Sequence, residues 1–225
     1  MDSKRLKAVL TLFTALSLAA GMSWAAGGGD IVKADPSKHF DAKGKPPSDY
    51  TVELQNALRQ NLPFEDKRDF EEAKKGFIAA PEYKQIMADA GHVAWDIGSY
   101  DWLLQGKDFD SIHPSLQRVA ILNMAYGLYE VLPGQIYQVR GYDLANISFI
   151  KSKTGWIIFD PLTAKETARA ALKFINEQLG ERPVVAVVYS HSHADHFGGV
   201  RGVVDEADVA SGKVKVIAPV GFMDH

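Results

Sequence analysis

Four residues with metal-binding side chains lie within six positions of one another: His191, His193, Asp195 and His196. They follow the apolar run 184–189, which is typical of a buried strand. An extended chain sends alternate side chains to the same face, so His191 and His193 can reach one point from the strand end. Imidazole and carboxylate donors suit zinc, and two donor pairs this close suit two ions. We therefore expect His191 and His193 on one zinc ion, and Asp195 and His196 on the other.

The chemistry expected of such a site is hydrolysis. Bound zinc lowers the pKa of its water from ~15.7 to about 7, which supplies hydroxide at neutral pH. Asp195 is expected to orient this hydroxide, and is therefore the predicted catalytic residue. Gly198 and Gly199 would let the backbone pass close to the ligands without a side-chain clash. A solvated polar turn is the alternative interpretation of the run.

Asp160 is the second candidate for a role at this site. It ends the apolar strand 156–159, so it should lie at the same sheet edge as the histidine run. A carboxylate there could accept the free ring N–H of a ligating histidine and fix its orientation. The alternative is an aspartate that simply begins the Asp160-Pro161 turn.

Composition limits the classes of protein that the chain can belong to. It has 225 residues, 46% of them hydrophobic and 24% charged, which is ordinary for a globular protein. The formal charge of −3 gives no reason to expect a nucleic-acid partner. The absence of cysteine excludes disulfides and thiolate ligands within these residues.

The first 25 residues have the layout of a cleavable signal peptide. Lys4, Arg5 and Lys7 precede the apolar stretch 8–22, and small residues flank a cleavage site near Ala25. The apolar stretch is short for a membrane span, which needs about 20 residues. We therefore expect a periplasmic or secreted protein without a stable membrane anchor.

The rest of the chain divides into a helical extension and a mixed α/β region. Residues 26–112 are predicted to form an arm followed by short helices, at about 50–60, 66–75 and 82–90. From residue 113 a helix is followed by strand-like runs at 136–140, 146–151 and 156–159. Thr163 to Glu166 form a capping-box start for a helix that ends at Gly180. The strand 184–189, a helix around 200–210 and the strand 214–218 complete a mixed sheet with helices packed on it.

Two zinc ions need more than four protein ligands, and the sequence offers no second compact cluster after His196. Of the remaining histidines, His39, His92 and His113 are expected to be surface or capping residues. We therefore expect residues 113–225 to be the amino-terminal part of a longer catalytic domain, and this chain to have little activity alone.

The histidine run, with Asp160 before it and Gly198-Gly199 after it, resembles the metallo-β-lactamase superfamily. Several other segments resemble the alkyl sulfatases within that superfamily. They are Asp69-Phe70-Glu71-Glu72-Ala73-Lys74-Lys75-Gly76-Phe77-Ile78-Ala79, Pro114-Ser115-Leu116, Gly127-Leu128-Tyr129-Glu130-Val131, residues 136–150 and residues 206–214.

This resemblance implies an αββα sandwich, here incomplete, with two zinc ions held by His191, His193, Asp195, His196 and later ligands. It also implies a homodimer for the full-length family member, and hydrolysis of alkyl sulfate esters such as dodecyl sulfate. The alternatives are a glyoxalase II-type thioesterase, a B3-type β-lactamase, or an inactive chain that only binds metal.

Overall fold

The computed structural model describes residues 46–224, and residues 47–224 lie in one compact unit. The predicted signal peptide and arm lie outside the described residues. No helix in the part that is described is long and apolar enough to cross a membrane.

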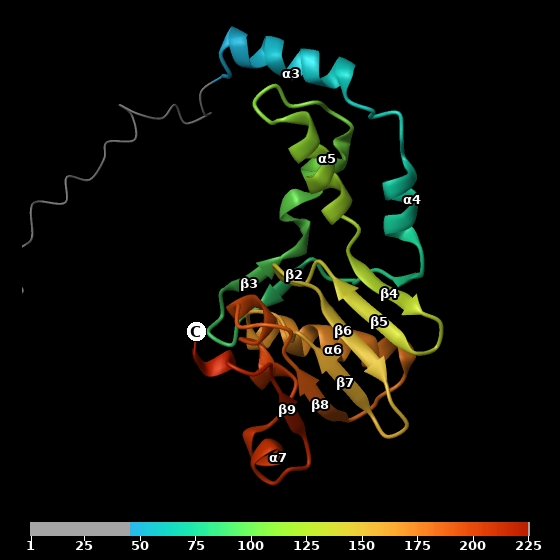
Figure 1. Cartoon of the computed structure of the whole chain (residues 1–225), viewed down its shortest axis with the longest axis vertical. Helices are drawn as coiled ribbons and strands as arrows, with labels where there is room; N and C mark the ends of the chain where they lie inside the picture. The colour runs from blue at the N-terminus through green and yellow to red at the C-terminus, as the bar shows by residue number, and fades with distance from the viewer. Residues whose placement is uncertain (1–45, 225) are drawn as a thin grey trace, which may run out of the picture. The chain divides into compact units, whose positions relative to one another are not determined.

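A seven-stranded mixed sheet is the centre of the structure, in the order β1-β4-β5-β6-β7-β8-β9 (Figure 1). Its strands are β1 (Phe77–Ala79), β4 (Gly127–Leu132), β5 (Ile136–Arg140), β6 (Ile147–Lys151), β7 (Trp156–Phe159), β8 (Val184–Val188) and β9 (Lys215–Ile217). The pairs from β1 to β7 are antiparallel, and β7-β8 and β8-β9 are parallel. The predicted mixed sheet is confirmed, although the sequence did not reveal β1 or the separate strand β4.

Helix α6 (Lys165–Leu179) packs on one face of this sheet and supplies most of the helical part of the core. Alternate residues of β5, β6 and β7 are buried, as expected for strands with one face toward a core. Trp156 is fully buried between the rings of Tyr137 and Phe149, at centroid distances of 6.0 and 5.9 Å. Its indole Nε1 donates to Asn176 Oδ1 of α6 at 2.8 Å, so Trp156 joins the sheet to this helix.

The predicted capping box of α6 is wrong. The N-cap is Ala164, and no side chain of the predicted box caps the helix. The buried carboxylate of Asp143 instead accepts hydrogen bonds from the backbone N–H groups of Thr163 and Ala164 and from the Thr163 hydroxyl. A side chain twenty residues upstream therefore holds the backbone that leads into the helix, and local sequence cannot predict such a tertiary contact.

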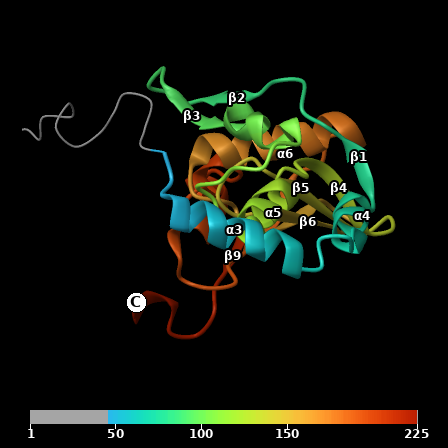
Figure 2. The same ribbon diagram turned by 90° about the horizontal axis from the view of Figure 1, so that it is seen from above.

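A small hairpin packs on the other side of α6 from the sheet (Figure 2). It consists of β2 (Gln85–Met87) and β3 (Val93–Asp96), and Ile86 of β2 is part of the main core. The helix predicted over 82–90 is therefore wrong. The residues of β2 are compatible with a helix by intrinsic propensity, but pairing with β3 and contact with α6 make this segment a strand.

The amino-terminal helices lie together above one end of the sheet in Figure 1. They are α3 (Asp49–Asn61), α4 (Arg68–Lys74), the 3-10 helix η1 (Ile97–Gln105) and α5 (Pro114–Asn123). His113 is the N-cap of α5, and its Nδ1 accepts from the Ser115 N–H, as expected for a capping residue. The predicted helix at 200–210 is divided into η3 (Val200–Gly202) and α7 (Glu206–Ala210).

Asp89, in the turn of the β2-β3 hairpin, provides a test of how that hairpin is held. Its carboxylate accepts from Arg169 and pairs with Lys165 of α6 at 2.8 Å, and these contacts lower its pKa to about 2. The unfolded pKa is about 3.9, so the stabilisation should be complete above that value and lost as the pH falls through about 2. Asp89→Asn should reduce the free energy of unfolding at pH 7, modestly because the pair is exposed, and much less at pH 2, where the folded carboxylate is already partly protonated. Urea titrations at both pH values measure this. Asp205→Asn is the matched control because Asp205 does not take part in any ion pair found in residues 46–224.

Candidate metal centre

The candidate site lies at the carboxyl ends of two neighbouring parallel strands. Asp160 directly follows β7, and its N–H donates to the Val188 carbonyl of β8 at 3.0 Å. Ser190 and the histidine run follow β8 after Tyr189. The predicted placement of Asp160 at the same sheet edge as the run is therefore confirmed, and parallel strands explain it.

The backbone of Asp160 has an unusual conformation that sets the direction of its carboxylate. Its φ is +54°, and Leu162 two residues later has a φ of +62°. Such left-handed values are costly for a leucine, so the surrounding packing must impose them. Leu162 is fully buried, and its carbonyl accepts from the Gly199 N–H at 2.8 Å. This strained turn therefore links the aspartate to the loop that carries the histidines.

Asp160 makes hydrogen bonds to both ends of the histidine run. One oxygen, Oδ2, lies 2.8 Å from His196 Nδ1 and accepts from the Ser190 hydroxyl at 2.6 Å, and the other accepts from the Ser190 N–H at 2.8 Å. Burial alone would raise the pKa of Asp160, but the bonds from Ser190 and His196 outweigh it and hold the pKa below its usual value. The carboxylate therefore stays an acceptor and can take the Nδ1 proton of His196, which would leave Nε2 available as a metal ligand.

Ser190 extends this network to His191, a role that the sequence did not reveal. Because the Ser190 hydroxyl donates to Asp160, its oxygen can accept the Nδ1 proton of His191, 2.9 Å away. His191 then also presents Nε2 as a lone pair. Position 190 opens the histidine run, so its place next to His191 was the signal that could have identified it.

The structure brings all three histidines of the run together. The ring centroids of His191 and His193 are 4.6 Å apart, and those of His191 and His196 are 4.1 Å apart. Asp195 Oδ2 lies 3.3 Å from His196 Nε2. Two ligands bound at about 2.1 Å to a tetrahedral ion are about 3.4 Å apart, so this donor pair has a separation suited to one zinc ion.

The side chains at the site are of the right types to bind zinc, but too few of them are brought together. Within residues 46–224, no group of three or more His, Asp or Glu side chains is arranged to hold a metal ion. The described residues therefore provide pairs of suitable donors and a carboxylate that orients them, but not a closed coordination set. The assignment of the four residues as ligands, and of Asp195 as catalytic, stays a prediction.

Gly199 allows the histidine loop to pack against the start of α6. A Cβ atom added at this position would lie 2.2 Å from the Pro161 carbonyl oxygen and 2.6 Å from that of Ala164. Glycine is therefore required here because the backbone passes close to the turn after Asp160. The sequence predicted instead a close approach to the metal ligands, and none of the three nearest atoms belongs to a histidine.

The Gly199→Ala variant should therefore be destabilised and its histidine loop displaced. Overpacking against rigid backbone costs about 1–3 kcal/mol, which urea unfolding would measure as a lower midpoint. Gly98→Ala is the control, because its added Cβ would meet nothing closer than 3.3 Å. Equal effects of the two substitutions would contradict the proposed close packing.

Comparison with known proteins supports both the fold and the relatives expected. Residues 140–225 match the metallo-beta-lactamase superfamily. The chain is 45% identical over 215 residues to a linear primary-alkylsulfatase of Pseudomonas sp., covering 95% of this chain and 30% of that protein. It is 50% identical over 181 residues to an (R)-specific secondary-alkylsulfatase of Pseudomonas sp., covering 80% of this chain and 27% of that protein.

A solved structure gives the same result at the level of the fold. The stereoselective inverting sec-alkylsulfatase from Pseudomonas sp. matches with a TM-score of 0.76 and 51% identity, over 80% of this chain and 28% of that one. The chain thus spans less than a third of the length of these relatives. The chain is thus similar to the alkylsulfatases over part of their length, and its residues 140–225 match the metallo-beta-lactamase superfamily.

Proposed function

We propose that this chain supplies part of the active site of a zinc-dependent hydrolase of alkyl sulfate esters. The single observation that carries the proposal is the hydrogen-bond network in which Asp160 orients His196 directly and His191 through Ser190. The names of the relatives, which are primary, secondary and alkyl/aryl sulfatases, support sulfate esters as the substrate class.

The proposed roles of the residues follow from their contacts. His191 and His196 offer Nε2 as donors, Asp195 offers its carboxylate beside His196, and His193 adds a third ring next to His191. Zinc held there would lower the pKa of a bound water to about 7 and neutralise charge on the ester. Asp195, 26% exposed, can accept a proton of that water and so orient it toward the substrate.

The same geometry is compatible with other hydrolytic chemistry. A thioesterase of the glyoxalase II type or a B3-type β-lactamase would use a similar ligand run. The alkylsulfatase relatives favour the sulfatase over both. Because the donor set is incomplete within residues 46–224, we propose that this chain has little activity without further ligands. We also propose that the protein is exported, which mass spectrometry of the mature amino terminus would test.

Release of inorganic sulfate from dodecyl sulfate, with zinc added, tests this proposal. The 225-residue chain should be nearly inactive, whereas a version lengthened to the size of its relatives should release sulfate. Strong activity of the 225-residue chain would refute the claim that essential ligands are missing. A lengthened chain that cleaved a thioester or a β-lactam but no sulfate ester would refute the substrate class.

A further inference from the structure

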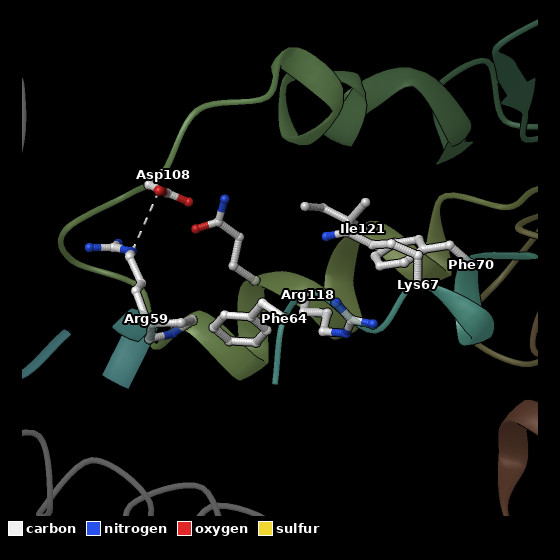
Figure 3. A pocket seen from close by; sticks show the side chains of 9 residues that line it. Arg59, Phe64, Lys67, Phe70, Asp108, Arg118 and Ile121 are labelled. Carbon is white, nitrogen blue, oxygen red and sulfur yellow. Dashed lines mark ion pairs between the residues drawn. The ribbon is translucent and has the colours of Figure 1, made fainter. Parts of the chain in front are cut away.

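A pocket of about 310 Å³ lies among the amino-terminal helices (Figure 3), and none of the residues that line it belongs to the histidine run. Arg59 of α3, Phe64 and Lys67 of the following connection, and Arg118 of α5 are among the residues that line it. Phe70 and Ile121 add to its apolar wall. The pocket thus combines positive charge with apolar and aromatic surface.

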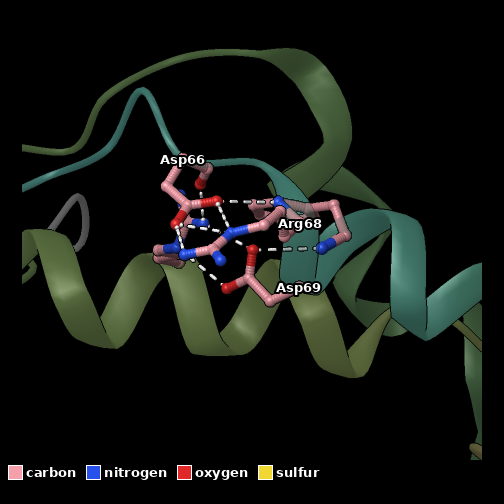
Figure 4. Close-up of polar contacts among 5 residues, drawn as sticks. Asp66, Arg68 and Asp69 are labelled. Atoms are coloured by element: carbon pink, nitrogen blue, oxygen red, sulfur yellow. Dashed lines mark hydrogen bonds and ion pairs between the residues drawn. The ribbon is translucent and has the colours of Figure 1, made fainter.

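Neighbouring groups hold the two arginines of the pocket in place. Asp69 lies beside Asp66 and Arg68 (Figure 4), and its Oδ2 accepts from Arg118 Nε at 3.2 Å. The guanidinium carbon of Arg118 lies 4.7 Å from the centroid of the Phe70 ring. Arg59 donates to the Phe109 carbonyl at 3.0 Å. These contacts fix the two planar cations before any ligand arrives, which reduces the entropy that binding must overcome.

Several cationic donors of the pocket are nevertheless unused. Arg118 bonds through Nε and Nη2, and its Nη1 donates to nothing in residues 46–224. The Arg59 Nε is buried without a hydrogen bond, and the nearest carboxylate oxygen, of Asp108, is 3.7 Å away. Lys67 takes part in no ion pair in the described part of the chain and is near the Phe70 ring, at 5.8 Å. Arg59 lies near Asp108 and Asp110, and Arg118 pairs with Asp69, so Lys67 is the only cation of the lining without an ion pair to a described residue. Lys67, together with the free Nη1 group of Arg118, gives the pocket its capacity to bind an anion.

We propose that this pocket binds a single-chain amphiphile with an anionic head group, such as an alkyl sulfate or a fatty carboxylate. Lys67 and the Nη1 group of Arg118 bind the head group, because their N–H donors are charged and unpaired. Phe64, Phe70 and Ile121 cover the alkyl chain. The pocket volume is at the lower end of the range for small-molecule sites, about 300–1,000 Å³, so short chains fit best. This site is independent of the proposed hydrolysis at the histidine run.

Calorimetric titration of the 225-residue chain with octyl sulfate, kept below its micelle concentration, tests the proposal. Octyl sulfate should bind, octanoate should compete with it, and octanol and inorganic sulfate should bind much more weakly. Lys67→Glu should weaken octyl sulfate at least about tenfold by reversing a charge beside the head group. Lys153→Glu, an exposed lysine in the turn after β6, should change nothing. His193→Ala should also leave this affinity unchanged, which separates the pocket from the metal centre.

Three results would overturn the proposal. If octanol bound as tightly as octyl sulfate, the site would recognise only the alkyl chain. If inorganic sulfate bound as tightly, the alkyl chain would contribute nothing to the affinity. Loss of octyl sulfate binding in His193→Ala with normal binding in Lys67→Glu would place the ligand at the histidine run. If Lys67→Glu does not fold by circular dichroism, Ile121→Ala gives the same test from the apolar side, with weaker octyl sulfate binding as the expected result.

Discussion

The His193→Ala variant should bind one zinc ion fewer than the parent chain. The substitution removes an imidazole donor next to His191, whose ring centroid is 4.6 Å from that of His193. His193 is exposed and its side chain makes no hydrogen bond to a described residue, so truncation of that side chain should leave the fold intact. Metal analysis after dialysis against buffered zinc measures the stoichiometry.

The matched control for this variant is His92→Ala, which removes an exposed histidine in the β2-β3 turn. That change should leave zinc uptake as it is in the parent chain. If His193→Ala and the parent bind the same number of zinc ions, the ligand assignment of His193 is wrong.

Trp156→Ala should be the most destabilising single substitution that we predict. The indole is fully buried, packs edge-on against Tyr137 and Phe149, and donates to Asn176 of α6. Removal of a buried tryptophan costs about 3–5 kcal/mol through lost burial and the cavity left behind. Guanidinium unfolding of the variant should show this loss as a lower midpoint.

Leu144→Ala is the corresponding control at the surface. Leu144 is 77% exposed, so its truncation should change the free energy of unfolding by no more than about 0.5 kcal/mol. A Trp156→Ala variant as stable as Leu144→Ala would contradict the central place of Trp156 in the core.

The sequence predicted the strands and the helix next to the site well, because their burial follows a local pattern. The strand 156–159 and the end of α6 at Gly180 were placed to the residue. By contrast, β2 was predicted as a helix, since three residues with one buried side chain carry no periodic signal. Its conformation depends on β3 and α6, which are distant in sequence.

The residues of the candidate site could be predicted from the sequence, but the hydrogen bonds between them could not. Residue types and spacing were enough to bring the three histidines and Asp160 to one sheet edge. The link from Asp160 through Ser190 to His191 depends on a turn in which Asp160 and Leu162 are both left-handed, and no local preference of leucine indicates such a conformation. The sequence likewise indicated that two zinc ions need more than four protein ligands, but not which residues would supply the others.

X-ray absorption at the zinc edge, on the zinc-loaded chain, tests the central claim most directly. We predict nitrogen and oxygen neighbours at about 2.0–2.1 Å with the outer scattering of imidazole rings, and fewer such rings in His193→Ala. Zinc that is not retained at all, or a spectrum with the same imidazole count in His193→Ala, would contradict the account. In that case His196 between Asp160 and Asp195 would be an ion pair in a polar turn and not a metal ligand.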